Sequence, residues 1–199
     1  MKKLFNYNFY NYKDIYPFLE VLKDNKIEIK NEVDNILKEK WNIWPEENLY
    51  TKGGEWKIFP FYGFDIWIEH NCKKCPVIFD ILKNIPGLKT ALLSKLKPNT
   101  TLDKHRGWAN LSNYVLRCQY GINVNSKCFL GCNEEIVKME EDMIVVFDDS
   151  EWHYAENKGD CDRIVLILDI ERPSYVKLGE SDIEETPELF DFINEIKNN

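Results

Sequence analysis

The sequence lacks any apolar run long enough to cross a membrane. It begins with Met1-Lys2-Lys3, but these lysines are not followed by the uninterrupted apolar segment that a signal peptide requires. These two absences favour a soluble, cytoplasmic protein with no membrane span.

An excess of positive charge is also missing. There are 34 Asp and Glu residues against 26 Lys and Arg residues, which gives a formal net charge of −8. Acidic pairs such as Glu134-Glu135 and Glu184-Glu185 would repel phosphate backbones and anionic lipid surfaces. We therefore expect no nucleic-acid partner, and the composition leaves the oligomeric state unknown.

The sequence contains no internal repeat, low-complexity block or long linker. A chain of 199 residues with 44% apolar residues falls in the size range of one domain with a substantial core. We expect a single domain over residues 1–199. It would comprise a helical and aromatic flank over about 1–87, a β-rich core over about 88–173 and a helix over about 186–197.

The six cysteines make an even count, yet a chain of this size does not need disulfide bonds for stability. We expect reduced thiols. The alternative is a structural zinc site, because Cys72 and Cys75 have the two-residue spacing of a zinc pair and Cys128 with Cys132 would supply a second half.

The first half of the chain has a mixed pattern. Apolar residues at helical spacing predict an amphipathic helix over Asp24–Lys40. The stretch Trp41–Pro60, rich in Trp, Pro and Gly, predicts an irregular connection that could line a pocket mouth. Strands are expected near 56–59 and 64–68, and a short helix over Pro76–Asn84.

The second half is mainly β. Short strand-like runs separated by turn residues are typical of a sandwich or barrel. These runs cover 112–122, 127–130, 134–139, 143–147 and 163–170. Thr186 followed by Pro187 predicts the start of a last helix that packs against the outside. Its apolar stripe would contain Leu189, Phe190, Ile193 and Ile196.

Two histidines and one arginine stand beside strand-like segments. His105 belongs to His105-Arg106-Gly107, His153 ends the run that starts at Phe147, and Arg163 opens an apolar strand. Imidazole suits iron, zinc and copper, and two such ligands far apart in sequence meet only if the fold closes on itself. The spacing therefore indicates a metal site with an anion clamp inside a closed β fold.

Strand alternation places Arg117 and Gln119 on one face of their strand and Arg163 on an inward face. An inward arginine keeps its charge and needs an anion nearby. For Arg163 that anion is a ligand or a protein carboxylate, with Asp149 and Asp169 as candidates. For Arg117 a salt bridge at the rim is an equal alternative.

Taken together, these residues resemble the aspartyl/asparaginyl β-hydroxylase family of iron(II)- and 2-oxoglutarate-dependent dioxygenases, over roughly Leu88–Pro173. The Phe-Asp-Asp-Ser…His run followed by an Arg at this spacing is the specific part. The resemblance implies a double-stranded β-helix, a cupin-like jelly roll that is mainly β with flanking helices and holds iron at one open end. The matching residues are Pro98, His105-Arg106-Gly107, Asn110, Leu116-Arg117, Asn133-Glu134, Phe147-Asp148-Asp149-Ser150, His153, Arg163, Asp169 and Pro173.

The resemblance also implies roles for single residues. His105 and His153 match the iron ligands, and Arg163, assisted by Ser94, matches the residue that binds the distal carboxylate of 2-oxoglutarate. Arg117 matches an arginine near the metal-side carboxylate. With O2, such a site hydroxylates an unactivated carbon. The expected substrate is the β-carbon of an Asp or Asn residue in a peptide or protein, or a related small molecule.

Two positions depart from common patterns. Gly107 stands where most iron oxygenases have a carboxylate, although glycine is expected there in this family. The open position that it leaves makes halogenation a minor alternative. Gln119 stands where the family often has a histidine; it donates a hydrogen bond but carries no charge.

Simpler interpretations apply to other residues. His70 has no matching motif and is expected to be structural or at the surface. Asp148 and Asp149 are expected to act as turn residues, and Trp108 and Trp152 to shape the substrate mouth. The alternative from another functional class is a non-catalytic jelly-roll module that binds a carboxylate.

Overall fold

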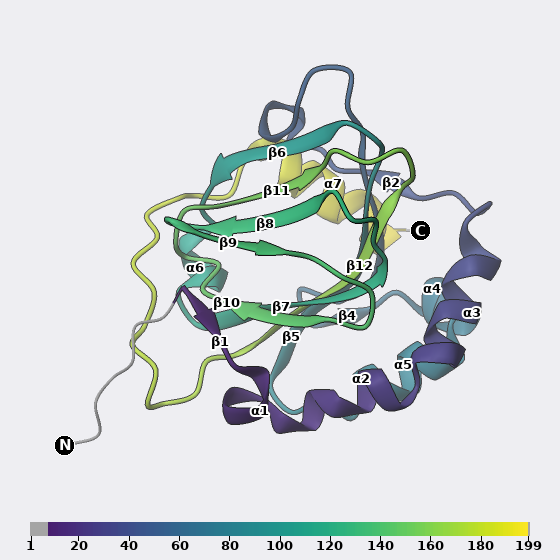
Figure 1. Cartoon of the computed structure of the whole chain (residues 1–199), viewed down its shortest axis with the longest axis horizontal. Helices are drawn as coiled ribbons and strands as arrows, with labels where there is room; N and C mark the ends of the chain where they lie inside the picture. The colour runs from purple at the N-terminus through teal and green to yellow at the C-terminus, as the bar shows by residue number, and fades with distance from the viewer. Residues whose placement is uncertain (1–7, 199) are drawn as a thin grey trace.

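Two antiparallel sheets face each other in the computed structural model, which describes residues 8–198 and the side chains of residues 8–195 (Figure 1). The major sheet has the order β1 (Phe9–Tyr10), β10 (Ile144–Phe147), β7 (Val115–Asn123), β12 (Arg163–Glu171), β5 (Leu88–Leu96), β3 (Trp56–Gly63) and β2 (Asn42–Ile43), and β4 (Ile66–Trp67) pairs with β3. The minor sheet has the order β6 (Thr100–His105), β11 (His153–Asn157), β8 (Cys128–Cys132) and β9 (Glu135–Lys138).

The chain passes repeatedly from one sheet to the other between β5 and β12. β5, β7, β10 and β12 lie in the major sheet, and β6, β8, β9 and β11 lie in the minor sheet. This alternation makes the double-stranded β-helix, so the predicted fold class is confirmed. Strand β3 belongs to the predicted flank over 1–87, yet it pairs with β5 inside the major sheet, so residue 87 is not a boundary within the sheet.

Short helices cover the outer face of the major sheet (Figure 1, lower right). They are α1 (Tyr12–Ile15), α2 (Glu20–Asp24), α3 (Lys26–Ile36), α4 (Glu69–Lys74) and α5 (Pro76–Leu82), with a 3-10 turn at Pro17–Leu19. Elsewhere lie α6 (Ala109–Ser112), α7 (Pro187–Asn198) and a 3-10 turn at Glu47–Leu49. None of the helices in the described part of the chain combines the length and apolar character needed to span a membrane.

Helix α3 is shorter than the predicted helix over Asp24–Lys40. It ends at Ile36, whose carbonyl accepts hydrogen bonds of 3.0 Å from the backbone N–H of Glu39 and of 2.9 Å from the Trp41 indole. Buried Glu32 accepts hydrogen bonds from the backbone N–H groups of Val77 and Ile78 at the start of α5. These contacts attach the two helices to each other.

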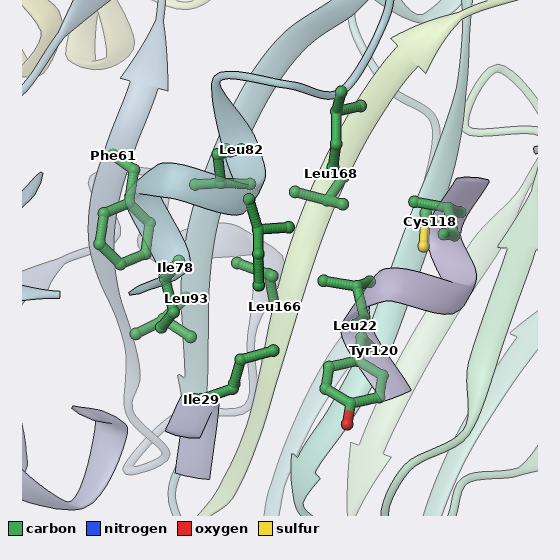
Figure 2. Packing of buried hydrophobic residues seen from close by; sticks show 14 of the residues in the cluster. Leu22, Ile29, Phe61, Ile78, Leu82, Leu93, Cys118, Tyr120, Leu166 and Leu168 are labelled. Carbon is green, nitrogen blue, oxygen red and sulfur yellow. The ribbon is translucent and has the colours of Figure 1, made fainter. Parts of the chain in front are cut away.

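The outer face of the major sheet forms a hydrocarbon core (Figure 2). Leu166 and Leu168 of β12 lie in this core together with Leu22 of α2 and Ile78 of α5. Residues that alternate with them on β12, such as Val165, point between the two sheets and form a second core there. The sheet therefore separates two cores.

Two further predictions were wrong in detail, and the structure also excludes the alternative of a shared zinc site. Ser112 ends α6, and the predicted strand over 112–122 begins only at Val115. Cys72 and Cys75 lie in the outer core, whereas Cys128 and Cys132 lie in the core between the sheets, so the pairs cannot share a zinc ion. All six cysteines are free thiols, as the sequence predicts.

The second wrong prediction concerns α7, which packs on the core between the sheets rather than on the outside. Leu189 and Ile193, one helical turn apart, are buried in that core. Phe190 is 51% exposed because it lies on another face of the helix, and the side chain of Ile196 lies outside the described residues.

Candidate active site

The two histidines of the motif lie directly opposite each other on neighbouring strands. His105 ends β6, His153 begins β11, and the two residues are partners in the antiparallel register. Their ring centroids are 4.2 Å apart. The fold therefore brings together the two imidazoles that the sequence singles out, at one end of the minor sheet.

Backbone carbonyls fix the tautomer of both rings. Nδ1 of His105 lies 2.7 Å from the carbonyl oxygen of Asp103, and Nδ1 of His153 lies 2.9 Å from that of Glu151. Because a carbonyl only accepts, Nδ1 is the protonated nitrogen and donates in each case. The Nε2 lone pairs are left for another partner.

The surroundings of both imidazoles favour the neutral form. Burial lowers the pKa of His105, and burial together with His105 and Arg117 holds the pKa of His153 well below its usual range. Neutral imidazole is the form that binds metals. Within residues 8–198, no group of three or more His, Cys, Asp or Glu side chains is arranged to hold a metal ion, so the pair is a candidate site with two protein ligands.

A carboxylate fills the space that Gly107 leaves open. A Cβ atom added to Gly107 would overlap the carboxylate of Asp149 and lie 2.7 Å from Cβ of Ser112. Asp149 Oδ1 also lies 3.3 Å from Nε2 of His153. The carboxylate missing from position 107 is thus replaced in space by one from the loop before β11.

Arg117 is paired with two protein carboxylates. Its guanidinium donates to Asp169 through Nε at 2.8 Å and Nη2 at 3.0 Å, and it also forms an ion pair with Asp149. Burial raises the pKa of Asp149 to about 7, and Arg117 opposes this rise. The alternative interpretation, in which Arg117 forms a salt bridge, therefore holds. Its carboxylate partners lie inside the protein rather than at the rim.

Arg163 is buried without an anion. It is 1% exposed, it donates from Nη2 to Oε1 of Gln119 at 2.7 Å, and its Nε has no partner. Burial lowers its pKa to about 10. Among the described residues no carboxylate pairs with it, so the alternative partners Asp149 and Asp169 are wrong; both pair with Arg117. A buried, uncompensated cation destabilises a fold unless a ligand supplies the charge.

Ser94 lies on the strand next to Arg163, opposite Val165, and is buried. Its hydroxyl accepts a hydrogen bond of 3.0 Å from the Trp56 indole. Asp148 accepts from the backbone N–H of Ser150 two residues on, as expected for a turn residue, and also pairs with buried Arg172. His70 is exposed on α4.

An apolar cavity adjoins the histidine pair. Trp44 stacks on Trp56 with ring centroids 4.5 Å apart and on Trp108 at 5.9 Å, and all three line the cavity next to His105. The predicted pocket mouth in the Trp41–Pro60 stretch and the expectation for Trp108 agree with this position. Trp152 is 49% exposed and does not line the cavity.

Sequence reasoning missed the contribution of α7 to this cavity. Leu189, Phe192 and Ile193 line it, and Phe192 contacts the Trp44 ring at 6.2 Å between centroids. The apolar stripe of the helix was visible in the sequence, but the surface against which it packs was not.

Comparison with known proteins adds a family match. The family model described as aspartyl/asparaginyl beta-hydroxylase matches residues 23–173. An ornithine lipid ester-linked acyl 2-hydroxylase of Rhizobium tropici is 36% identical over 121 residues, which are 59% of this chain and 42% of that protein. Aspartate beta-hydroxylase domain-containing protein 2 of Xenopus tropicalis is 28% identical over 170 residues, 78% of this chain and 45% of that protein.

The chain thus covers less than half the length of these two relatives. Among solved structures, a prolyl hydroxylase from Trichoplax adhaerens, in complex with a peptide fragment of hypoxia inducible factor, has a TM-score of 0.53 at 12% identity. The likeness covers 74% of this chain and 79% of that one, and it concerns the fold alone.

Proposed function

The chain belongs to the aspartyl/asparaginyl β-hydroxylase family, and from this premise we propose that it is an iron(II)- and 2-oxoglutarate-dependent dioxygenase that hydroxylates an unactivated carbon. We further propose that it works as a single oxygenase domain built around the two facing sheets. The observation that carries the proposal is the pair of facing imidazoles of His105 and His153, together with a buried Arg163 that no carboxylate among the described residues neutralises.

The donor set fits this metal and this cosubstrate. Two Nε2 lone pairs, from His105 and His153, suit iron(II). The guanidinium of Arg163, with Nε unpaired, suits the distal carboxylate of 2-oxoglutarate, and Gln119 holds its Nη2. Bound iron, 2-oxoglutarate and O2 together supply the oxidising chemistry, which converts 2-oxoglutarate to succinate and CO2.

The protein side chains then bind, orient and exclude water. Burial favours the neutral form of both imidazoles, and the backbone carbonyls of Asp103 and Glu151 hold each ring in place. The apolar residues between the sheets keep the interior dry, which strengthens the attraction of Arg163 for a carboxylate. Ser94 and Arg117 remain candidate cosubstrate residues, although in the structure each is engaged with another side chain.

Two substrate classes follow from the relatives. The family name points to the β-carbon of an Asp or Asn residue in a peptide or protein, or to a related small molecule. The name of the Rhizobium tropici relative points to a lipid acyl group.

The two alternative functions fit the site less well. Halogenation needs room for a halide beside the metal, and the Asp149 carboxylate fills the space at Gly107. A module that only binds a carboxylate through Arg163 gives no reason for two facing imidazoles whose Nδ1 atoms are held by backbone carbonyls.

Iron and 2-oxoglutarate binding test the proposal. Anaerobic protein loaded with iron(II) and 2-oxoglutarate should show a weak visible charge-transfer band, and in air it should form succinate. His153→Ala should remove both signals, whereas His70→Ala, a change of the same kind at an exposed histidine, should keep them. Wild-type protein with neither signal, or His153→Ala protein with both, would contradict the proposal.

A further inference from the structure

A segment without regular secondary structure, residues 177–185, runs between β12 and α7 along the loop 106–113 that follows His105. We call this segment the strap. It lies beyond the segment 23–173 that matches the family model. Backbone and side-chain groups join it to the loop, in these pairs: Gly179 N–H to the Asn113 carbonyl at 2.9 Å, Asn113 Nδ2 to the Ser181 carbonyl at 3.0 Å, Ala109 N–H to the Ile183 carbonyl at 2.8 Å and Asn110 Nδ2 to Oε1 of Glu185 at 2.8 Å.

The strand ladder is irregular at the histidines themselves. His105 and His153 are register partners, but the pairing of β6 with β11 shifts between His153 and Ala155. A shift of this kind disrupts the ladder hydrogen bonds locally. The carbonyl that accepts from each Nδ1 lies two residues earlier in the same segment of chain, so it orients a ring without fixing the distance between the rings. That distance depends on contacts between the two loops that carry the histidines.

Arg106 connects these two loops with the strap. It follows His105 in the chain, and its Nε donates at 2.6 Å to the carbonyl oxygen of Ser150, which lies shortly before His153. Its Nη2 donates to the carbonyl oxygen of Glu180 in the strap. One guanidinium thus joins the loop of the first histidine, the turn before the second and the strap.

The carbonyl contacts of Arg106 contribute more than its ion pair. The partner in that pair, Asp182, is 86% exposed, and an exposed ion pair contributes about 0–1 kcal/mol. The Arg106 side chain is 17% exposed, and hydrogen bonds from a charged donor are about twice as strong as neutral ones. A further hydrogen bond between the loops, from the N–H of Gly107 to the carbonyl oxygen of Asp149 at 2.8 Å, is of the neutral kind. Arg106 is therefore the stronger link.

We propose that Arg106 is a positioning residue that holds His105 and His153 at the separation needed to share one metal ion, and that the strap holds Arg106 in place. The inference rests on the proposed function, because it takes the two imidazoles as metal ligands. A site with two protein ligands has no third one to compensate for a displaced ring, so its affinity depends on how well the two are held.

Metal titration of the full chain tests this role without turnover. Cobalt(II), a probe with visible absorption bands, is added to metal-free protein. Arg106→Ala should weaken cobalt binding by about 10–100-fold, the usual loss when a group that supports a metal ligand is removed. Arg106→Lys, which keeps the charge but lacks the planar fork, should recover part of this loss. Asp182→Asn, which removes the charge of the exposed partner and leaves the carbonyl contacts, should bind within about twofold of the wild type.

Thermal melting separates positioning from folding. Metal-free Arg106→Ala should melt close to the metal-free wild type, and cobalt should raise its melting temperature less. Ser181→Ala, which removes the strap hydroxyl that donates to the Gly107 carbonyl at 2.6 Å, should also weaken cobalt binding. It tests the strap if Arg106→Ala does not fold. Cobalt affinity equal to that of the wild type in the folded variants, or an equal loss in Asp182→Asn and Arg106→Ala, would overturn the inference.

Turnover distinguishes this inference from the proposed function. For Arg106→Ala, the iron concentration that gives half-maximal succinate formation should rise, while the rate at saturating iron stays close to that of the wild type. Wild-type protein that binds cobalt but forms no succinate with iron(II) and 2-oxoglutarate would overturn the dioxygenase and leave the role of Arg106. Succinate formation by the wild type, together with unchanged cobalt affinity in Arg106→Ala, would overturn that role and leave the dioxygenase.

Discussion

The two faces of the major sheet carry different kinds of side chain on the same strands. On the outer face, β7 contributes Cys118 and Tyr120 and β12 contributes Leu166, all packed under helices. On the inner face, β7 contributes Arg117, which is half-buried, and β12 contributes Arg163, which is buried. Successive residues of these strands therefore alternate between an apolar environment on the outer face and a charged one on the inner face.

The outer face therefore mainly stabilises the fold, whereas the inner face carries the charged group that is expected to bind a ligand. Groups on the outer face are matched by apolar neighbours within the fold. Charges on the inner face are matched in one case by protein carboxylates, at Arg117, and in the other, at Arg163, by none among the described residues. A group that the fold itself leaves unmatched is the one expected to meet a ligand.

The largest effect is expected where an inner-face charge is structural. Arg117→Met should lower the free energy of unfolding by about 3–5 kcal/mol, because it leaves Asp149 and Asp169 buried without their cation. Urea unfolding measures this change. A variant as stable as the wild type would show that the inner face contributes nothing to stability and would break the comparison.

An outer-face truncation should come next. Leu166→Ala should lower the free energy of unfolding by about 2–5 kcal/mol through lost burial and a cavity. The remaining folded protein should bind 2-oxoglutarate as before, because Leu166 points away from the site. Leu166→Met is the control, with an expected loss below about 1.5 kcal/mol. Calorimetric titration at a temperature where both variants are folded is the measurement.

Arg163→Leu should produce the opposite pattern. We expect 2-oxoglutarate binding to weaken by about 1.5–3 kcal/mol, the contribution of hydrogen bonds to a charged group. The unfolding free energy without ligand should stay equal or increase, because an unpaired buried cation is removed. The thermal stabilisation that 2-oxoglutarate gives the wild type should shrink accordingly. Unchanged binding would refute the role of Arg163.

The smallest expected effect is that of the buried cysteine thiols on stability and on alkylation, and it should be the same on both faces of the major sheet. Burial raises the pKa of Cys72 to about 11 in the outer core and that of Cys132 to about 12 in the inner core. In the unfolded protein a thiol has a pKa of about 8.5. The stability that the buried, neutral thiols contribute is therefore complete below that pH and is lost as the pH rises toward the pKa values of the folded protein. At pH 8 an alkylating reagent should label exposed Cys161 in the folded protein and all six thiols in urea. Labelling of Cys132 before unfolding would indicate an opening on the inner side.

The ends of elements and the partners of side chains were the weakest predictions. The sequence predicts a helix as far as Lys40, but α3 ends at Ile36, whose carbonyl accepts from the Trp41 indole and from the N–H of Glu39. It leaves Asp169 as a possible partner of Arg163, yet the register of β7 and β12 places Arg117 opposite Asp169. Such contacts depend on which strands become neighbours, and a local pattern does not contain that information.

By itself the sequence predicted a β-rich second half of sandwich or barrel type, and its resemblance to the hydroxylase family implied the double-stranded β-helix and the candidate residues His105, His153 and Arg163, since strand alternation and motif spacing are properties of the chain order. Only the tertiary structure decided that Arg117 is neutralised while Arg163 is not, and that α7 closes a groove rather than covering the outside. The physical reason is that charge compensation and packing are set by neighbours in space, which come together only when the two sheets close.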